Sequence, residues 1–105
     1  MKIIKDIVSK MNDTLEEIDY YASKAHHIKS EHKALADTYI KIAEMHIEIY
    51  GMLHDRVVKI IEEQKSKGVE VPREMQIIWE YEHENLVKEF AKAKFLVEEY
   101  KKTGY

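Results

Sequence analysis

Apolar side chains recur along the first quarter of the chain at alternating steps of four and three residues. They are Ile4, Val8, Met11, Leu15, Ile18, Ala22 and Ala25. Residues at this spacing share one side of an α-helix, where they form the narrow apolar stripe typical of helical bundles and coiled coils. The stripe passes unbroken through residues 12–14, although Asp13 and Glu16 resemble a capping box that would start a new helix there. The pattern therefore predicts one helix over about 3–29.

Two further helices follow, each with its own start and stop signals. Ser30 is a suitable N-cap for a second helix over about 31–67, and Gly68 stands where many helices end in a left-handed residue. Pro72 favours the first turn of a third helix over 73–102. The predicted core stripe of the second helix is Leu35, Tyr39, Ile42, His46, Ile49, Leu53, Val57 and Ile60. That of the third is Met75, Trp79, Glu82 or His83, Leu86, Phe90, Ala93, Val97 and Tyr100.

The composition agrees with an all-α fold. The 105 residues include three glycines and one proline, so the chain has few of the residues that β-turns require. Short connections between consecutive helices make them antiparallel neighbours. The sequence therefore predicts a single domain over 1–105, an antiparallel three-helix bundle with ferritin-like or coiled-coil-like packing.

Charge and hydropathy argue against several classes of partner. The net charge is −3, whereas a nucleic-acid-binding domain normally carries a basic excess on one face. No run approaches 18 apolar residues, so we expect no membrane span, and the charged first residues do not resemble a signal peptide. The absence of cysteine excludes disulfides and thiolate metal sites. We expect a cytoplasmic protein without nucleic-acid or membrane partners.

The second and third helices carry more apolar residues than a three-helix core requires. These extra positions are Ile40, Met45, Ile47 and Met52 in the second helix and Ile77, Tyr81 and Phe95 in the third. They can be buried between the neighbouring helices of one chain, or they can form a surface for self-association. Because the surplus occurs on two helices, the sequence favours a homo-oligomer with these residues at its interface.

The stretch EMHIEIYGMLH (44–54) concentrates histidines and glutamates in about three helical turns. At 100° per residue, Glu44 and Glu48 fall on the opposite side of the helix from His46, so they cannot share a metal ion with it. Folding back at the turn near residue 30 brings His46 level with Glu16 of the first helix. We interpret His46 either as an ordinary core histidine or as a metal ligand together with Glu16.

A second polar group interrupts the stripe of the third helix. Glu80 and His83 lie three residues apart, the spacing of carboxylate–histidine metal motifs in helical bundles. The alternative is an ion pair between Arg56 and Glu82, which a fold-back near residue 70 brings level. Because His83 lies about ten residues, or about 15 Å, from the level of His46, only an oligomer could join the two histidines in one site.

Part of the sequence resembles the helical hairpin of ferritin-like proteins, in particular the short encapsulated ferritins. The similar segments are LEEIDYY (15–21) and LADTYIKIAEMHIEIYGML (35–53). The resemblance implies a glutamate ligand on the first helix, a Glu-x-x-His motif on the second and a di-iron site completed across a dimer. Glu16 and His46 match two of these ligands, but Ala43 stands where the motif has glutamate. The chain is also similar, more loosely, to small helical accessory proteins of phages and prophages.

The missing carboxylate implies a degenerate metal site. Iron, zinc or manganese are the ions that Glu16, His46, Glu80 and His83 would bind, and ferroxidase chemistry is the only enzymatic alternative. The sequence has no glycine-rich phosphate loop and no serine nucleophile elbow. We expect a small non-catalytic helical protein, without a cofactor, that acts through self-association and contact with an unidentified protein partner. Inhibition of a larger enzyme complex through the acidic outer faces is a further alternative.

Overall fold

The computed structural model describes residues 2–68 and 73–102, apart from the side chains of Glu74, Met75 and Ile78. These residues form three helices and no strand: α1 (Lys2–Ile28), α2 (Lys33–Ser66) and α3 (Arg73–Lys102). The helices lie along the long axis of a molecule that measures 56 × 20 × 18 Å. The predicted all-α class is confirmed, and the helix bounds differ from the predicted ones by at most two residues.

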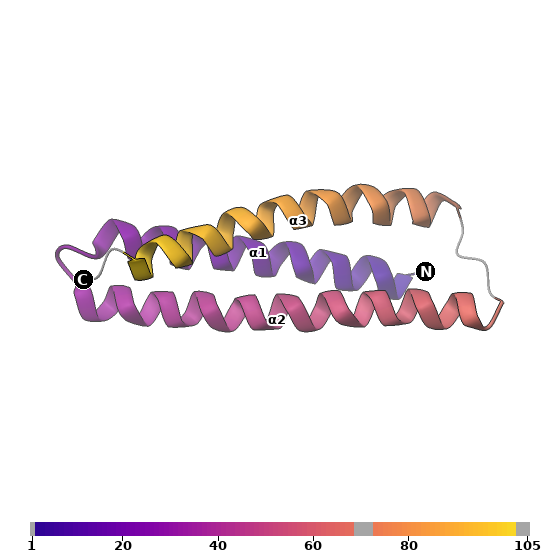
Figure 1. Cartoon of the computed structure of the whole chain (residues 1–105), viewed down its shortest axis with the longest axis horizontal. Helices are drawn as coiled ribbons and strands as arrows, with labels where there is room; N and C mark the ends of the chain where they lie inside the picture. The colour runs from indigo at the N-terminus through magenta and orange to yellow at the C-terminus, as the bar shows by residue number, and fades with distance from the viewer. Residues whose placement is uncertain (1, 69–72, 103–105) are drawn as a thin grey trace.

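Each helix runs antiparallel to the one before it (Figure 1). α1 packs against both other helices, whereas α2 and α3 have the least contact with each other. The amino terminus of α1 lies toward the end of the molecule where α2 stops and α3 begins, and the carboxyl end of α3 lies beside the α1–α2 turn. The core therefore forms around α1, and α3 covers it from one side.

All the apolar residues of the predicted α1 stripe are buried. Thr14 joins them, and its hydroxyl donates to the Lys10 carbonyl oxygen over 2.7 Å, so this buried polar group is satisfied inside the helix. The helix continues through residues 12–14 without a break, as the unbroken stripe predicts. Met11 and Ile18 are fully covered, which places the centre of the core in the middle of α1.

The buried stripe of α2 differs from the predicted one. It consists of Ala36, Ile40, Ala43, Tyr50 and Val57, with Ile47 partly buried against the same core. Two residues of the predicted stripe, Leu35 and Ile49, are instead 45% and 43% exposed. Val57 of the predicted stripe is buried, and Tyr39, Leu53 and Ile60 are partly buried against the core. The prediction is therefore right in part, but its centre is rotated from the observed one by nearly one residue, or about 100°.

The size of the buried side chains explains this difference. Ala36 and Ala43 of α2 are fully covered, as are Ala22 and Ala25 of α1. Small side chains on both helices let the two backbones approach closely, and a close-packed interior leaves no room for larger residues at these positions. The prediction favoured bulkier residues beside the alanines of α2, and it therefore assigned Leu35 and Ile49 to the core.

The predicted stripe of α3 is confirmed from Trp79 to Tyr100, while the side chain of Met75 lies outside the described residues. Leu86, Ala93, Val97 and Tyr100 are buried, and Trp79 and Phe90 are partly buried against the same core. Leu86, in the middle of the helix, is fully covered. α3 thus docks through one line of mainly apolar residues, which agrees with its smaller contact with the other two helices.

The carboxyl end of α2 follows the prediction. Gly68 has a left-handed backbone with a φ of 72°, and its amide donates to the Lys65 carbonyl oxygen over 3.1 Å. Glycine adopts this conformation without the steric cost that other residues incur. The predicted stop signal is therefore confirmed, and Pro72, the predicted start of α3, lies outside the described residues.

The amino end of α2 corrects the prediction. The N-cap residue is His32, without a side-chain hydrogen bond to the helix, and the helix begins at Lys33. The amides of Glu31 and His32 both donate to the Ile28 carbonyl oxygen, over 3.1 and 2.8 Å. Ser30 therefore stays within the turn that ends α1 and does not cap α2.

Candidate functional site

His46 is half-buried on the flank of α2 that faces α1. Its ring stacks on Tyr21 with 5.9 Å between the ring centroids, and its Nδ1 lies 2.9 Å from the Ile42 carbonyl oxygen. Because a carbonyl oxygen can only accept, Nδ1 carries the proton and donates it, which leaves Nε2 as an acceptor. Tyr21 also contacts Tyr39 edge-on at 5.4 Å. His46 therefore packs as a hydrogen-bonded member of an aromatic cluster.

Glu16, the expected partner of His46, lies elsewhere. It is exposed and lines a surface hollow of about 290 Å³ together with Asp19, Glu89 and Lys92. The described residues that line this hollow come from α1 and α3 only. Glu16 and His46 therefore lie on different flanks of α1, and the structure does not bring them together.

The histidine that His83 contacts is His54 of α2. Their Nε2 atoms are 3.0 Å apart, a hydrogen-bonding distance, and their ring centroids are 5.2 Å apart. One Nε2 must donate and the other must accept, so the pair holds one proton between these two atoms. At the other nitrogen of His54, the Asp55 carboxylate lies 3.6 Å from Nδ1. His54 and His83 together are termed the histidine pair, and they connect α2 to α3.

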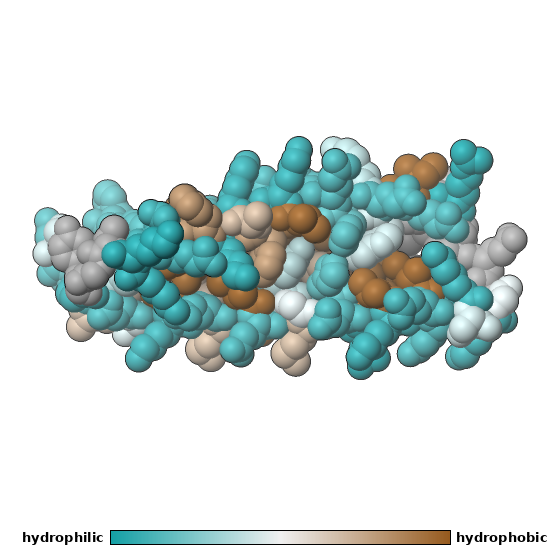
Figure 2. Space-filling model, viewed as in Figure 1, coloured by the Kyte–Doolittle hydropathy of each residue, from teal (hydrophilic) through white to brown (hydrophobic). Residues whose placement is uncertain are grey.

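Aromatic rings surround the histidine pair. The Trp79 ring centroid lies 5.0 Å from that of His83, and Tyr50 stacks on Phe90 at 4.4 Å nearby. Figure 2 shows separate apolar patches in the band between α3 and α2, bordered by hydrophilic side chains. Burial lowers the pKa of His83, and the charge of the neighbouring His54 lowers it further. His83 is therefore a neutral imidazole at pH 7, the form of histidine that binds metal ions.

The other predicted ligand and the predicted ion pair take no part in this cluster. Glu80 is exposed, and Glu82 lines a separate hollow of about 250 Å³ with Lys5 and Trp79. Arg56 is exposed, and within the described ranges it forms no ion pair with Glu82. Among the side chains that the structure describes, no three His, Cys, Asp or Glu residues are close enough to hold a metal ion.

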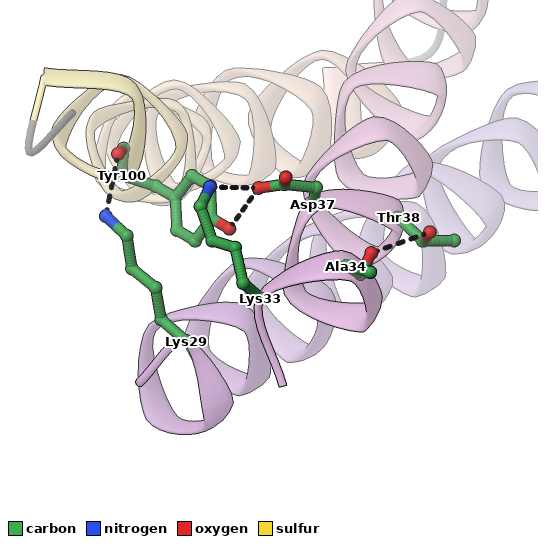
Figure 3. A network of polar contacts seen from close by, with 6 residues as sticks. All are labelled: Lys29, Lys33, Ala34, Asp37, Thr38 and Tyr100. Carbon is green, nitrogen blue, oxygen red and sulfur yellow. Dashed lines mark hydrogen bonds and ion pairs between the residues drawn. The ribbon is translucent and has the colours of Figure 1, made fainter. Parts of the chain in front are cut away.

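A polar network joins the last turn of α3 to the α1–α2 turn (Figure 3). The Tyr100 hydroxyl donates to the Asp37 carboxylate over 2.6 Å, and Lys33 forms an ion pair with the same oxygen. Lys29 is buried; its Nζ donates to the Tyr100 carbonyl oxygen over 3.2 Å and lies 4.2 Å from the centre of the Tyr100 ring. These four residues, Lys29, Lys33, Asp37 and Tyr100, are termed the end clamp.

The end clamp places positive charge at the carboxyl end of α3. The hydrogen bond from Lys33, and then that from Tyr100, lowers the pKa of Asp37, while the bond to Asp37 raises the pKa of Lys33. The ammonium of Lys29 faces a carbonyl oxygen in the last turn of α3, where the helix dipole is negative. One turn earlier, Nε2 of His26 lies 2.7 Å from the Leu96 carbonyl oxygen. The clamp therefore caps α3 and fixes it to the turn.

The side of α2 that faces away from both other helices carries a second line of mainly apolar residues. This line, termed the outer stripe, consists of Leu35, Thr38, Ile42, Met45, Ile49 and Met52. Its members alternate at steps of three and four, so they share one side of α2, about 135° from the buried stripe. Met45 and Met52 are 61% and 70% exposed, and Leu35 and Ile49 are nearly half exposed.

The four residues of α2 expected at an oligomer interface fall into two groups. Ile40 is 3% exposed and belongs to the core, which corrects its assignment to an interface. Ile47 is partly buried against the same core. The rotation of α2 relative to the prediction accounts for both positions. Met45 and Met52, in contrast, lie on the outer stripe and are available for contact.

The three residues of α3 expected at an interface are all exposed: Ile77, Tyr81 and Phe95. They do not form a continuous line, because the exposed charged residues Glu84 and Lys88 lie between Tyr81 and Phe95 on the same side of the helix. Single exposed apolar side chains are common on protein surfaces. The continuous apolar surface that the structure describes is therefore on α2.

No helix in the described part of the chain has an apolar segment long enough to cross a membrane. Comparisons with protein-family models, with curated proteins and with solved structures found no match. We therefore infer function from the outer stripe, the histidine pair and the end clamp.

Several residues of these features were not predicted from the sequence, among them His54 and three members of the end clamp, Lys29, Lys33 and Asp37. His54 could have been found from the spacing of small residues on α2. Ala36, Ala43 and Tyr50 follow one another at steps of seven residues and share the buried side of the helix, and His54 lies one turn beyond Tyr50 on the same side. The signal for Lys29 is weak, because a lysine beside a turn is normally solvated.

Proposed function

We propose that this protein is a non-catalytic helical module that self-associates through the outer stripe of α2. The observation that carries the proposal is the continuity of this stripe, which extends over about five helical turns. Four of its residues are between 43% and 70% exposed. Apolar surface of this extent, concentrated on one helix, is typical of protein–protein interfaces. Its spacing suits insertion between the residues of a facing helix, as in coiled coils.

The partial resemblance to ferritin-like proteins supports association. The outer stripe lies within 35–53, one of the two resembling segments, and that family completes its metal site across a dimer. An accessory role like that of the similar phage proteins would also use such a surface. Binding of a different protein through the outer stripe, including inhibition of a larger enzyme complex, is the competing outcome of the test.

Light scattering on a size-exclusion column should give a mass of at least two chains for the wild type. Met45→Glu introduces a charge at the centre of the outer stripe, and burial of an unpaired charge is costly, so association should weaken by roughly 100-fold or more. Because Met45 is 61% exposed within one chain, the helical circular dichroism signal of the variant should remain.

Phe95→Glu is the matched control, since Phe95 is 58% exposed but lies on α3. We expect it to leave the mass unchanged. A wild-type chain that remains monomeric at high concentration would contradict self-association. Dissociation by Phe95→Glu, with Met45→Glu still associated, would move the interface from α2 to α3.

A specific observation favours a second function, the binding of a transition-metal ion by the histidine pair. Two nitrogens that bind one tetrahedral zinc ion at 2.0–2.1 Å are about 3.3 Å apart, and the two Nε2 atoms are already 3.0 Å apart. Imidazole nitrogens suit zinc better than manganese. The carboxylate of Asp55, beside Nδ1 of His54, is the kind of group that orients a metal-bound histidine. Water would supply the remaining ligands.

Thermal denaturation of untagged protein with added zinc chloride tests this second function. At a zinc concentration 100 times the Kd, the fold should gain about 2.7 kcal/mol. His54→Ala and His83→Ala should each abolish the shift in melting temperature. His46→Ala, a half-buried histidine outside the pair, should retain it. A shift that persists in both pair variants would assign the zinc to other histidines, and no shift in the wild type would contradict metal binding.

A further inference from the structure

We infer that two copies of this chain pair through antiparallel α2 helices, with Lys41 of one copy facing Glu48 of the other. The inference rests on the proposed self-association through the outer stripe, and it adds the direction and register of the second copy. Two properties of α2 carry it: the different chemistry of the two flanks of the stripe, and the positions of its charges.

The outer stripe has one charged flank and one flank of two aromatic rings and a leucine. The charged flank consists of the exposed Lys41, Glu48 and Asp55, and the other consists of the half-buried Tyr39, His46 and Leu53. Tyr39 and His46 both contact the ring of Tyr21, so this second flank continues onto α1. The stripe is therefore bordered by unlike surfaces along its length.

This asymmetry selects the direction of pairing. In a parallel pair of helices, the charged flank of each copy meets the opposite flank of the other copy. The charged flank would then lie against Tyr39 and His46 of the second copy, without opposite charges. In an antiparallel twofold pair, each flank meets its own counterpart. Lys41 and Glu48 of the charged flank then face each other, and Tyr39 and His46 of the other flank lie against the same flank of the second copy.

The register follows from the length of the stripe. Leu35 and Met52 are its ends, so a twofold axis at its middle gives complete overlap of the two stripes. Leu35 then faces Met52 of the second copy, and Ile42 faces Met45. Any shift along the helix would leave part of one stripe uncovered, at about 25 cal/mol for each Å² of apolar surface that stays in water.

The charges agree with this register independently. When Ile42 faces Met45 of the second copy, Lys41 faces Glu48, and the twofold axis repeats this pair on the other side. Neither Lys41 nor Glu48 forms an ion pair within the part of the chain that the structure describes. One register thus covers the outer stripe and pairs opposite charges twice.

Cysteine cross-linking tests the register, because the chain has no cysteine of its own. Leu35→Cys and Met52→Cys are purified separately, mixed while reduced, and then oxidised. We expect a disulfide between the two variants and none in either variant alone. In this register the two copies of residue 35 are about 17 residues, or 26 Å, apart along the helix, whereas a disulfide requires Cα atoms within about 7 Å.

The other possible outcomes distinguish a parallel pair, a different register and a monomer. Disulfides in each variant alone would indicate a parallel pair and overturn the inference, while self-association itself would stand. A dimer without any cross-link between Leu35→Cys and Met52→Cys would overturn this register. A wild-type chain that is monomeric by light scattering would overturn the proposed function, and that measurement distinguishes it from the other two failures.

Charge reversal provides a second measurement that keeps the apolar stripe intact. Lys41→Glu and Glu48→Lys each place like charges together twice, so each should weaken dimerisation roughly tenfold. The double variant K41E/E48K should regain the wild-type affinity. Lys88→Glu is the matched control, since Lys88 is exposed on α3, away from the outer stripe. A double variant that stays as weak as the single variants would overturn the contact.

Discussion

Tyr100→Ala is expected to lower the free energy of unfolding by about 3–5 kcal/mol, the usual cost of truncating a buried aromatic side chain. Tyr100 is 5% exposed, and the Lys29 ammonium lies 4.2 Å from its ring centre. Without the ring, Lys29 loses its cation–π contact and Asp37 loses one hydrogen-bond donor. Denaturant unfolding followed by circular dichroism measures the effect.

Tyr100→Phe separates the contribution of the ring from that of the hydroxyl. It keeps the ring and removes only the donor to Asp37, which retains its ion pair with Lys33. We therefore expect a loss of about 1 kcal/mol from this variant. Equal losses from the Ala and Phe variants would contradict a role for the ring. Unchanged stability in Tyr100→Ala would mean that the end clamp does not hold the last turn of α3.

The α1 core could be predicted residue by residue because this helix has a single apolar side. α2 has two, the buried stripe and the outer stripe, and the stripe predicted from its pattern falls between them because it favours residues larger than Ala36 and Ala43. The buried side carries the fully covered Ala36 and Ala43, whose small side chains allow close packing, and this depends on how the helices fit together. Such packing is a tertiary property that the period of one helix does not report.

The same limit affected the candidate site. Folding back near residue 70 put His83 level with Arg56, within one turn of its observed contact His54, so the position along α2 was nearly right. The predicted rotation of α2 about its own axis was wrong by about 100°. This error placed His46 toward the core and His54 toward the edge of the core. The contact between Lys29 and Tyr100 spans 71 residues, and no local pattern indicates it.

Leu86→Ala is expected to cost about 2–5 kcal/mol, because Leu86 is fully covered and its removal leaves a cavity under α3. Val87→Ala, at the 49% exposed neighbouring position, should change stability by no more than about 0.5 kcal/mol. Because α3 has less contact with the rest of the chain than α1 and α2 have with each other, the loss should appear first as opening of α3. Native-state hydrogen exchange would measure it as faster exchange of α3 amides than of α1 amides.

The Leu86→Ala variant also separates the fold from self-association. The outer stripe belongs to α2, so loosening α3 should leave the associated mass unchanged in light scattering while exchange in α3 accelerates. Equal acceleration in all three helices would contradict local opening, because the chain would then unfold as one cooperative unit. Loss of association in Leu86→Ala, at a temperature where α1 and α2 remain folded, would mean that α3 contributes to the interface and that the outer stripe is not sufficient.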